Sequence, residues 1–392
     1  MIPVAVRLNP FKRPKGEIPI LDGARRVPWS PHAYILKDRP SFTLDPLFHA
    51  GCYYVQDSSA MYTGHVFRKC LDSFGPGVRV LDLCAAPGGK TTDLAASLRE
   101  RFGSEWTLVS NEVMRERSRI LDDNVARWGD PRVIVTGVDP AAFARFPGAF
   151  DIIVADVPCS GEGMFRKDEG AVEQWSPEVV QLCAARQKRI LGDVWPALRD
   201  GGVLIYSTCT YEDAENDDNL SWAADSLGGD IIPAENEFPE YGVRLTRHGN
   251  LLKAGEVPGE GQWVGALCKR GGDARMAREP DFSSLRPIRT VFSPGEKRGT
   301  VKGKDFVPDA DWALSLDFDS GLYPSAELDL QTALNYLHRD AIVLPDAELG
   351  YNVVTYKGIA LGFVKNLGRR CNNLLPQGRR ILMDVNLKKR EI

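Results

Sequence analysis

The sequence predicts an α/β protein built on a doubly wound parallel sheet. Between residues 78 and 206, short apolar runs typical of buried strands alternate with helical patterns, and this alternation is typical of a parallel sheet with helices on both faces. Glycine-rich or polar segments follow several of these runs directly, where open α/β sheets bind their ligands. The length of 392 residues predicts two or three domains.

Each element of the sheet is predicted from its own pattern. Residues 176–199 are expected to form a helix, because Ser176 can cap its start and Pro177 fits the first helical position. Asp200-Gly201-Gly202 is expected to end this helix. The other helices are expected at Thr91–Arg101 and Arg115–Trp128. The strands are expected at Val78–Cys84, Trp106–Glu112, Arg132–Asp139, Phe150–Val157 and Val203–Tyr206.

Changes in composition divide the chain into four parts. Residues 1–75 are rich in proline and aromatic residues and are expected to be an N-terminal substrate-binding segment. Residues 76–270 are expected to hold the sheet domain. Residues 271–308 are polar and basic and are expected to be a flexible linker. Residues 309–392 are expected to form a small C-terminal domain.

Two strand pairs are expected outside the parallel sheet. Val243–Leu245 and Trp263–Cys268 are expected to pair around the glycines at 259 and 261. Tyr351–Tyr356 and Ile359–Val364 are separated by Lys357-Gly358, which predicts a hairpin in the C-terminal domain.

Bulk properties exclude several classes of protein. No apolar run reaches the ~20 residues of a membrane span, and the N-terminus lacks the pattern of a signal peptide, so we expect a cytoplasmic protein that does not bind membranes. The eight cysteines form no Cys-x-x-Cys pair and the five histidines do not cluster with them, so neither a metal site nor a disulfide framework is expected. The net charge of −4 argues against a protein that coats nucleic acid. Local basic stretches after Lys269 and Lys365 remain able to meet a phosphate backbone or to be solvated segments.

A glycine-rich turn follows the first predicted strand. Pro87-Gly88-Gly89 precedes a helix, and glycines there let backbone N–H groups approach a ligand closely. A P-loop needs glycine at position 84, where this chain has Cys84. The turn therefore favours a cofactor without a triphosphate, and a plain tight turn is the alternative.

Acidic residues end the second and third predicted strands. Glu112 lies about twenty residues past the turn, where a ribose diol is usually held, and an ordinary surface carboxylate is the alternative. Asp139 can meet an adenine amino group or cap the turn that begins at Pro140.

Two cysteines follow the last two predicted strands. Cys159 stands in Asp156-Val157-Pro158-Cys159-Ser160-Gly161, and Cys209 stands in Ser207-Thr208-Cys209-Thr210. Because such strands are often neighbours, we expect both thiols to face one pocket. Two ordinary core cysteines are the alternative, and it is weakened by the Ser or Thr that follows each cysteine.

This pattern suits methyl transfer to a pyrimidine ring. Carbon 5 of cytosine is a weak nucleophile, and a thiolate that adds to carbon 6 makes it electron-rich enough to accept a methyl group from a sulfonium donor. The carbon 5 proton must then leave and the thiolate must be eliminated, which a second ionisable group can assist. Asp156 is expected to hydrogen-bond the base, and Lys90 is a positive charge that favours the thiolate.

The same segments resemble the motif series of the RNA 5-methylcytosine methyltransferases, the Nol1/Nop2/Sun family. They are most similar to its bacterial RsmF-like 16S rRNA branch. The resemblance covers roughly residues 40–270 and, less closely, the C-terminal tail. It rests on Cys84–Thr91, Asn111-Glu112, Asp139, Asp156–Gly161, Ser207–Thr210, Gly161–Arg166 and Leu361–Gly368.

The resemblance implies a Rossmann-like class I methyltransferase sheet, with a short N-terminal RNA-binding segment and a PUA-like RNA-binding domain over residues 309–392. It implies S-adenosyl-L-methionine as donor, with Glu112 at the ribose, Asp139 at the adenine and Asp156 near the site of methyl transfer. It implies Cys209 as nucleophile and Cys159 as the residue that aids release; the chemistry of the residues alone leaves this order open. The loop implied to hold the cofactor is Cys84, Ala85, Ala86, Pro87, Gly88, Gly89 and Lys90.

The expected function is therefore methylation of cytosine carbon 5 in RNA, with 16S rRNA or the small ribosomal subunit as substrate and a monomer as the acting species. The nearest alternative is the same chemistry on tRNA. A non-catalytic ribosome-assembly factor with the same fold is an alternative from another class. A P-loop-type nucleotide hydrolase is the weakest, because Cys84 breaks its motif.

Overall fold

The computed structural model describes residues 3–162, 172, 175–272, 280–291 and 296–387. Gly163–Arg166 of the motif series, parts of the predicted linker and the residues from Lys388 onward lie outside the described residues. In the part of the chain that is described, no helix is both long and apolar enough to cross a membrane.

A nine-stranded mixed sheet forms the centre of the fold and confirms the predicted α/β class. Its strand order is β11-β12-β13-β9-β8-β5-β6-β7, and β10 also pairs with β13. The order reverses between β5 and β8, so the carboxyl ends of these two strands form the switch point where such sheets bind ligands. The parallel strands are β5 (Val78–Asp82), β6 (Trp106–Asn111), β7 (Val133–Thr136), β8 (Phe150–Asp156) and β9 (Leu198–Thr208).

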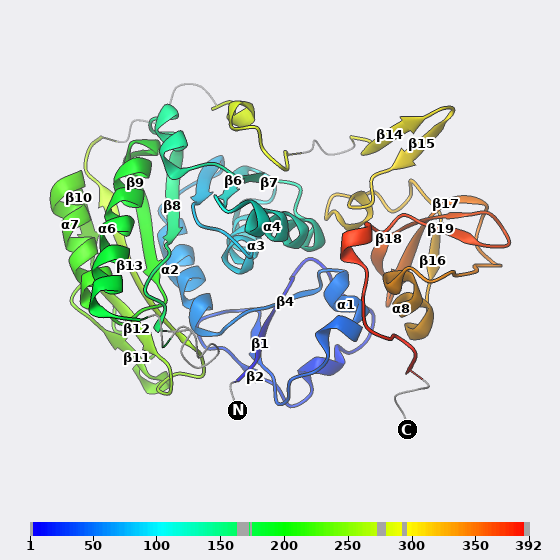
Figure 1. Cartoon of the computed structure of the whole chain (residues 1–392), viewed down its shortest axis with the longest axis horizontal. Coiled ribbons are helices and arrows are strands. Elements are labelled where there is room, and N and C mark those ends of the chain that lie inside the picture. Colours follow the sequence, from blue (N-terminus) through cyan, green and yellow to red (C-terminus); the bar gives the residue numbers. More distant parts are fainter. Residues whose placement is uncertain (1–2, 163–171, 173–174, 273–279, 292–295, 388–392) are drawn as a thin grey trace.

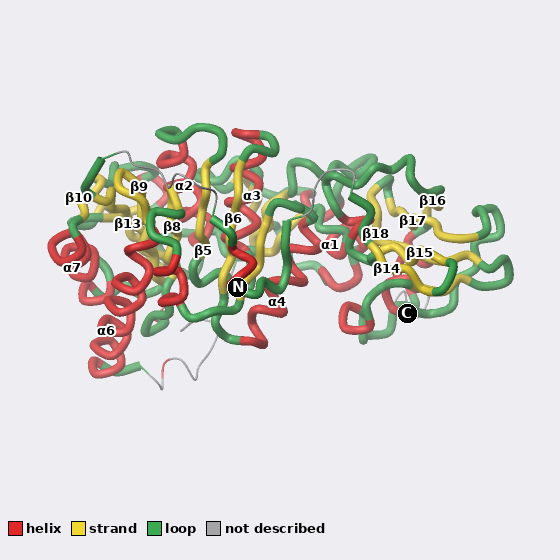
Figure 2. The backbone as a smooth tube through the Cα atoms, turned by 90° about the horizontal axis from the view of Figure 1, so that it is seen from above, coloured by secondary structure: helices red, strands yellow, loops and turns green. Residues whose placement is uncertain are grey.

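Helices cover both faces of this sheet (Figures 1 and 2). One face holds α2 (Tyr62–Leu71), α3 (Gly89–Phe102) and α4 (Arg115–Trp128), and the other holds α6 (Pro177–Val194) and α7 (Asp217–Leu227). Alternate residues of each strand face the two hydrophobic cores, one on each side of the sheet. Val80 and Ile152 pack with the first set of helices, while Leu81 and Ile153 pack with the second. A strand buried on both faces needs apolar residues at every position, and this requirement explains the continuous apolar runs of the sequence.

The helix predicted over residues 176–199 is too long. α6 ends at Val194, a 3₁₀ turn follows at Trp195–Ala197, and β9 already begins at Leu198. Pro196 lacks a backbone N–H and cannot continue the helix. The segment Asp200-Gly201-Gly202, which was expected to stop the helix, lies inside β9 instead.

The predicted pairing of Val243–Leu245 with Trp263–Cys268 is wrong. A short strand, β12 (Gly249–Lys253), lies between β11 (Val243–Leu245) and β13 (Gly261–Lys269) and pairs with both. β13 pairs antiparallel with β9, and β10 (Gly229–Ile232) pairs with β13. β12 escaped prediction because its five residues carry little periodic signal.

The N-terminal segment forms a sheet of its own, with the order β2-β3-β1-β4. It packs against the C-terminal part of the chain, because Val6 and Tyr53 share a core with Leu334 and Val364. Figure 1 shows α1 beside β18 and α8. The elements of the segment are β1 (Ala5–Leu8), β2 (Arg25–Arg26), β3 (Ala33–Ile35), α1 (Pro46–His49) and β4 (Tyr53–Val55).

The C-terminal part holds a second small sheet, with the order β16-β17-β18-β19. The predicted hairpin is confirmed, since β17 and β18 pair antiparallel on either side of the Lys357-Gly358 turn. The elements of that sheet region are β16 (Ser325–Glu327), α8 (Leu330–His338), β17 (Gly350–Tyr356), β18 (Ile359–Asn366) and β19 (Cys371–Asn373). Before them, β14 (Gly299–Lys302) and β15 (Asp305–Pro308) form a separate two-stranded sheet.

Part of the segment expected to be a flexible linker is packed against the sheet domain. Phe282 is buried and stacks on Phe150, with 5.4 Å between ring centroids, and Leu285 joins the same core. The backbone of Arg289 bridges to Val135 of β7. The stretch 280–291 is therefore anchored by two apolar side chains that its polar composition obscures.

Candidate active site

The glycine-rich turn lies at the switch point of the sheet. Leu83 N bonds to Val154 O and Ala85 N bonds to Asn111 O, so the turn is tied to both strands that flank β5. Gly88 adopts a φ of 110°, a conformation that favours glycine, directly before α3 begins. The N-terminus of α3 therefore points its free amides to this edge.

A buried carboxylate stands under the turn. Asp82, at the end of β5, accepts a hydrogen bond from Thr91 Oγ1 at 2.6 Å. Its other oxygen, Oδ1, is buried and has no partner among the described residues. Burial raises the pKa of Asp82 to about 7, against the hydrogen bond from Thr91 that lowers it.

Glu112 follows β6 and is also buried. Its Oε1 accepts from Met114 N at 2.9 Å, and Arg117 Nη1 lies 3.5 Å from its Oε2. Arg117 also donates to Ala86 O at 2.9 Å. The carboxylate thus lies beside the turn, on the side of α4.

Asp139 lies three residues beyond the end of β7, which stops at Thr136 rather than at Asp139. Its exposed side chain accepts from Ala141 N at 3.0 Å and caps the 3₁₀ turn that begins at Pro140. The capping alternative is therefore realised, and the role at the adenine stays a prediction.

Asp156 ends β8 and is held by three side chains. Lys90 Nζ lies 2.8 Å from Oδ2, while Ser207 Oγ and Gln262 Nε2 donate to Oδ1 at 2.7 and 3.0 Å. These contacts come from α3, β9 and β13. All three are donors, and together they fix the orientation of the Asp156 carboxylate.

The two thiols come together, as predicted from the neighbouring positions of their strands. Cys159 Sγ and Cys209 Sγ are 3.0 Å apart, and both residues are partly buried. The hydrogen bond from the Cys159 thiol lowers the pKa of Cys209, and Lys90 lowers it further, against burial and Asp156. The same hydrogen bond and burial raise the pKa of Cys159. The pair therefore favours a thiolate at Cys209 beside a thiol at Cys159.

Cys84 is a different kind of cysteine. Burial raises the pKa of its thiol, and Asp156, Asp82 and Glu112 raise it further. Burial and these carboxylates therefore favour the protonated thiol of Cys84.

Sequence reasoning assigned no role to four polar residues around this site: Glu162, Gln187, Glu215 and Gln262. Gln262 and Glu215 are buried. For Gln262, the sequence shows only a polar residue at the start of an apolar strand run. For Glu215, it shows only an acidic segment after Cys209. Neither signal indicates a partner, because each of these side chains reaches a residue far away in the sequence.

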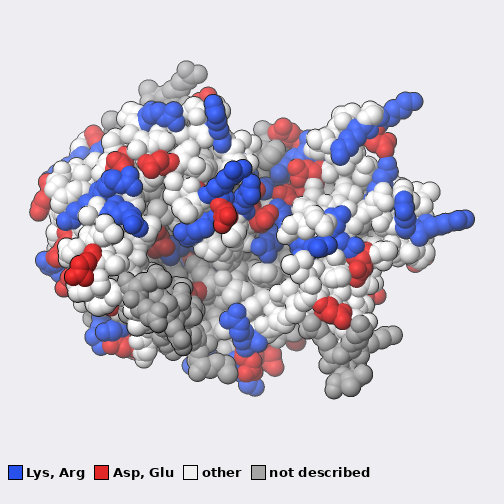
Figure 3. Space-filling view, in the orientation of Figure 1, with Lys and Arg blue, Asp and Glu red and all other residues white. Residues whose placement is uncertain are grey.

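The charge on the face drawn in Figure 3 is mixed, with Lys and Arg side chains gathered near the centre. At the start of α4, Arg115, Arg117 and Arg119 are exposed. A basic group therefore lies beside the carboxyl edge of the sheet, although the whole chain is acidic.

Family models match three parts of the chain. Residues 74–225 match the family described as 16S rRNA methyltransferase RsmB/F. Residues 1–58 match the N-terminal domain of 16S rRNA methyltransferase RsmF, and residues 323–381 match the methyltransferase RsmF PUA domain.

Curated relatives share more than a third of the aligned residues. Ribosomal RNA small subunit methyltransferase F of Salmonella agona is 38% identical over 285 residues, which is 70% of this chain and 55% of that protein. The protein of the same name from Escherichia coli O157:H7 is 38% identical over 205 residues, 52% of this chain and 41% of that protein. The chain thus spans about half the length of these relatives.

Solved structures share the fold. A methyltransferase homolog protein from Pyrococcus horikoshii is 26% identical, with a TM-score of 0.54 over 69% of this chain and 87% of that one. NSun6 from Pyrococcus horikoshii with SFG has the same TM-score at 16% identity, over 69% of this chain and 91% of that one. These matches assign residues 74–225 to the RsmB/F methyltransferase family, and residues 1–58 and 323–381 to N-terminal and PUA domains of the RsmF type.

Proposed function

We propose that this protein methylates carbon 5 of cytosine in RNA, with 16S rRNA as substrate, through a covalent bond between Cys209 and carbon 6 of the base. The observation that carries the proposal is the pair of thiols 3.0 Å apart at the ends of β8 and β9. Lys90 and Asp156 stand beside them. The family described as 16S rRNA methyltransferase RsmB/F supports the substrate class.

The residues at the switch point fit S-adenosyl-L-methionine. The carboxylates of Asp82, Glu112 and Asp156 lie close enough to Cys84 to raise the pKa of its thiol. Asp82 Oδ1 has no partner in the described part of the chain. Such an acidic setting suits a ligand that carries a sulfonium and an ammonium group. The residues that would hold the cofactor are those of the turn Cys84–Lys90, with Glu112 at the ribose, Asp139 at the adenine and Asp156 near the reacting methyl.

When bound, the cofactor supplies an electrophilic methyl group. The residues of this chain do the rest. The Cys209 thiolate adds to carbon 6, and the electron pair of the 5,6 double bond moves to carbon 5, which then takes the methyl group. Asp156 accepts a hydrogen bond from the base, and its three donors hold it in place for that contact.

Release requires a base. Carbon 5 now carries both the methyl group and a proton, and Cys159 aids the removal of this proton. The electron pair of the C–H bond restores the 5,6 double bond as the bond from carbon 6 to Cys209 breaks. Once Cys209 is bonded to carbon 6 it no longer carries the negative charge that favours a neutral Cys159, so the second thiol becomes easier to ionise at the step that needs it.

The RNA would be met by positive side chains near the site and by the C-terminal part of the chain. Arg115 and Arg119 are exposed on α4, near the carboxyl edge of the sheet. The match of residues 323–381 to an RsmF PUA domain supports a role for that part in holding RNA.

The test is Cys159→Ala expressed in the native host. Because release would fail, we expect a denaturation-resistant protein–RNA band, and sequencing of the attached RNA would name both the substrate and the cytosine. The band should vanish in the double variant Cys159→Ala/Cys209→Ala.

Other outcomes separate the alternatives. If the attached RNA is tRNA and not 16S rRNA, then tRNA is the substrate. No band together with lost methylation would make Cys159 the nucleophile. Cells in which Cys209→Ala leaves function intact would favour a non-catalytic assembly factor, and a purified protein that binds S-adenosyl-L-methionine but labels neither rRNA nor tRNA would contradict the proposal.

A further inference from the structure

A carboxylate from the loop that carries Cys159 reaches the loop that carries Cys209. Glu162 lies three residues after Cys159. It accepts hydrogen bonds from Thr210 Oγ1 at 2.8 Å and from Tyr211 N at 2.7 Å, directly after Cys209. The backbone that carries the Cys209 thiol is therefore held by the loop of the other thiol.

A carboxylate from the Cys209 loop likewise contacts the Cys159 loop. Glu215 lies six residues after Cys209 and is 0% exposed. Its two oxygens accept from Ser160 N, directly after Cys159, at 3.1 and 3.3 Å. Gln187 Nε2 donates to the same carboxylate at 2.7 Å. Burial raises the pKa of Glu215, while the hydrogen bonds from Ser160 and Gln187 lower it and favour the ionised form.

A third contact joins the two loops between these carboxylates. Ser160 Oγ and Thr210 Oγ1 are 3.0 Å apart. Three hydrogen-bonded links, which share Ser160 and Thr210, therefore connect the residues just after one thiol to those just after the other. They hold the sulfur atoms at their short separation.

We propose that Glu162 and Glu215 are positioning residues that clasp the two cysteine loops together, and that the negative charge of Glu215 keeps Cys159 as a thiol so that Cys209 is the thiolate. This inference rests on the proposed function, because it explains how one cysteine becomes the nucleophile. The chemistry of two cysteines alone leaves that order open, and the charges of this chain decide it.

The charges around the pair are arranged unevenly. The hydrogen bond to Cys209 and burial raise the pKa of Cys159, and Glu215 raises it further. On the other side, Lys90 lowers the pKa of Cys209 while Asp156 opposes it. Among the described residues, further ionisable neighbours of the pair are Glu162, Tyr206 and Tyr211. Glu215 and Lys90 therefore act in opposite directions on the two thiols.

The first test measures the reactivity of each thiol in the full chain. Iodoacetamide labelling is followed over a series of pH values, and initial rates at Cys159 and Cys209 are read by peptide mass spectrometry. In the wild-type protein Cys209 should react at lower pH than Cys159. In Glu215→Gln the amide oxygen can still accept from Ser160 and Gln187, so the geometry remains while the charge is lost, and Cys159 labelling at neutral pH should rise several-fold.

Asp217→Asn is the matched control. Asp217 is also buried, lies two residues further on, and accepts from His248 N at 2.6 Å and Thr246 Oγ1 at 3.1 Å. Its loss should leave both labelling profiles unchanged. Unchanged profiles in Glu215→Gln, or the same change in both variants, would overturn the assignment of Glu215.

The second test concerns the clasp itself. Glu162→Ala removes the acceptor for Thr210 and Tyr211 and should lower kcat at least tenfold with KM for RNA unchanged, whereas Glu162→Gln keeps an acceptor oxygen and should restore most of the rate. A Gln variant as slow as the Ala variant, or a change in KM alone, would contradict the positioning role.

The two tests also separate this inference from the proposed function. Thiol labelling needs neither RNA nor cofactor. If the wild-type protein methylates no RNA, the proposed function fails, and the labelling profiles still decide whether Glu215 sets the charge of the pair.

Discussion

At the residue scale, the site is organised by the distribution of charge around two neighbouring thiols. Cys159 and Cys209 both follow a parallel strand, and both are partly buried. Lys90 reaches Asp156 at 2.8 Å and acts on Cys209. A single ammonium group therefore serves two neighbours, since it orients the carboxylate and favours the thiolate.

Replacing Lys90 by methionine tests this double role. Because Lys90 lowers the pKa of Cys209, its removal should raise that pKa, reduce methyl transfer at neutral pH by about 100-fold, and move the pH–rate profile upward so that part of the activity returns at high pH. The measurement is the pH dependence of kcat.

Lys69→Met serves as its control, because Lys69 pairs with Glu235 and Glu237 at the surface. It should leave the profile in place. A Lys90→Met enzyme that is slow but keeps the wild-type pH profile would rule out an electrostatic role on the thiol.

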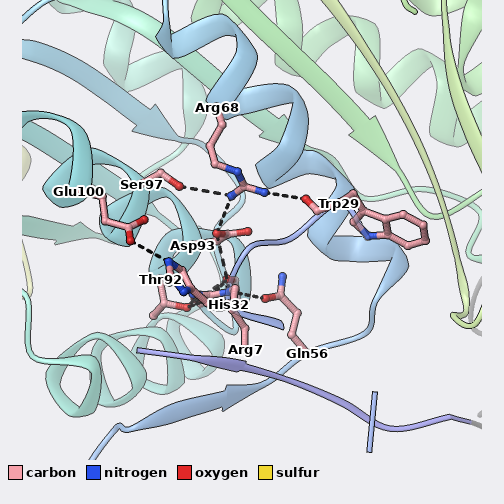
Figure 4. A network of polar contacts seen from close by, with 11 residues as sticks. Arg7, Trp29, His32, Gln56, Arg68, Thr92, Asp93, Ser97 and Glu100 are labelled. Carbon is pink, nitrogen blue, oxygen red and sulfur yellow. Dashed lines mark hydrogen bonds and ion pairs between the residues drawn. The ribbon is translucent and has the colours of Figure 1, made fainter. Parts of the chain in front are cut away.

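At the element scale, β1 and α4 hold the glycine-rich turn from outside the site. Arg7 of β1 is buried and donates to Gly89 O at 3.0 Å and to Thr92 Oγ1 at 2.6 Å, at the start of α3 (Figure 4). Asn124 of α4 donates to Pro87 O at 2.7 Å. The turn is thus fixed by two elements that flank it in space and are remote in sequence.

Arg7→Met should destabilise the protein by about 3 kcal/mol, because it removes a buried cation from the carboxylate of Asp93, 3.8 Å away, together with the hydrogen bonds that Arg7 donates to Gly89 and Thr92. Urea unfolding measures the loss. Because Arg7 also holds Gly89, affinity for S-adenosyl-L-methionine should fall as well.

The exposed Arg13, whose Nε donates to the nearby carbonyl of Pro10, offers the comparison. Arg13→Met should change stability by less than about 0.5 kcal/mol. Equal losses of unfolding free energy in the two variants would show that the buried contacts of Arg7 do not contribute to stability.

At the scale of the whole molecule, the N-terminal sheet, the central domain and the C-terminal part form continuous contacts. The C-terminal part is joined to α4 by ion pairs centred on Asp311, which meets both Arg379 and Arg289. Arg379 also reaches Asp123, and Arg289 reaches Asp122, both on α4. Together with the apolar core shared by β1 and α8, this network sets where the proposed RNA-binding part sits relative to the site.

Asp311→Asn should weaken this junction in a pH-dependent way. Burial raises the pKa of Asp311, but Arg379 and Arg289 outweigh it and hold the pKa at about 2, below the ordinary 3.8. A lowered pKa means that the stabilisation, about 2 kcal/mol, is fully present above about pH 4 and is lost as the pH falls toward about 2. The difference in unfolding free energy between wild type and variant should therefore be constant near neutrality and shrink in acid.

Asp305→Asn is the comparison at this scale. Asp305 pairs with Lys365 at the surface, with 55% of its side chain exposed, and exposed pairs contribute little. If Asp305→Asn lowers the unfolding free energy as much as Asp311→Asn does, the buried network contributes no more to stability than an exposed ion pair.

The sequence by itself determined the parallel strands, the turn after β5 and the convergence of both thiols. Strands buried on both faces leave continuous apolar runs, and residues directly after such strands reach one edge of the sheet. The hairpin of β17 and β18 was readable for a similar reason, since its turn lies between two adjacent strands.

Only the tertiary structure decided the contacts between distant segments. The insertion of β12 between β11 and β13, the core shared by Val6 and Leu334, and the crossed carboxylates Glu162 and Glu215 all join residues that no local pattern relates. Periodicity reports which side of an element is buried, but it does not report what lies against that side. The partner is chosen by the packing of the complete chain.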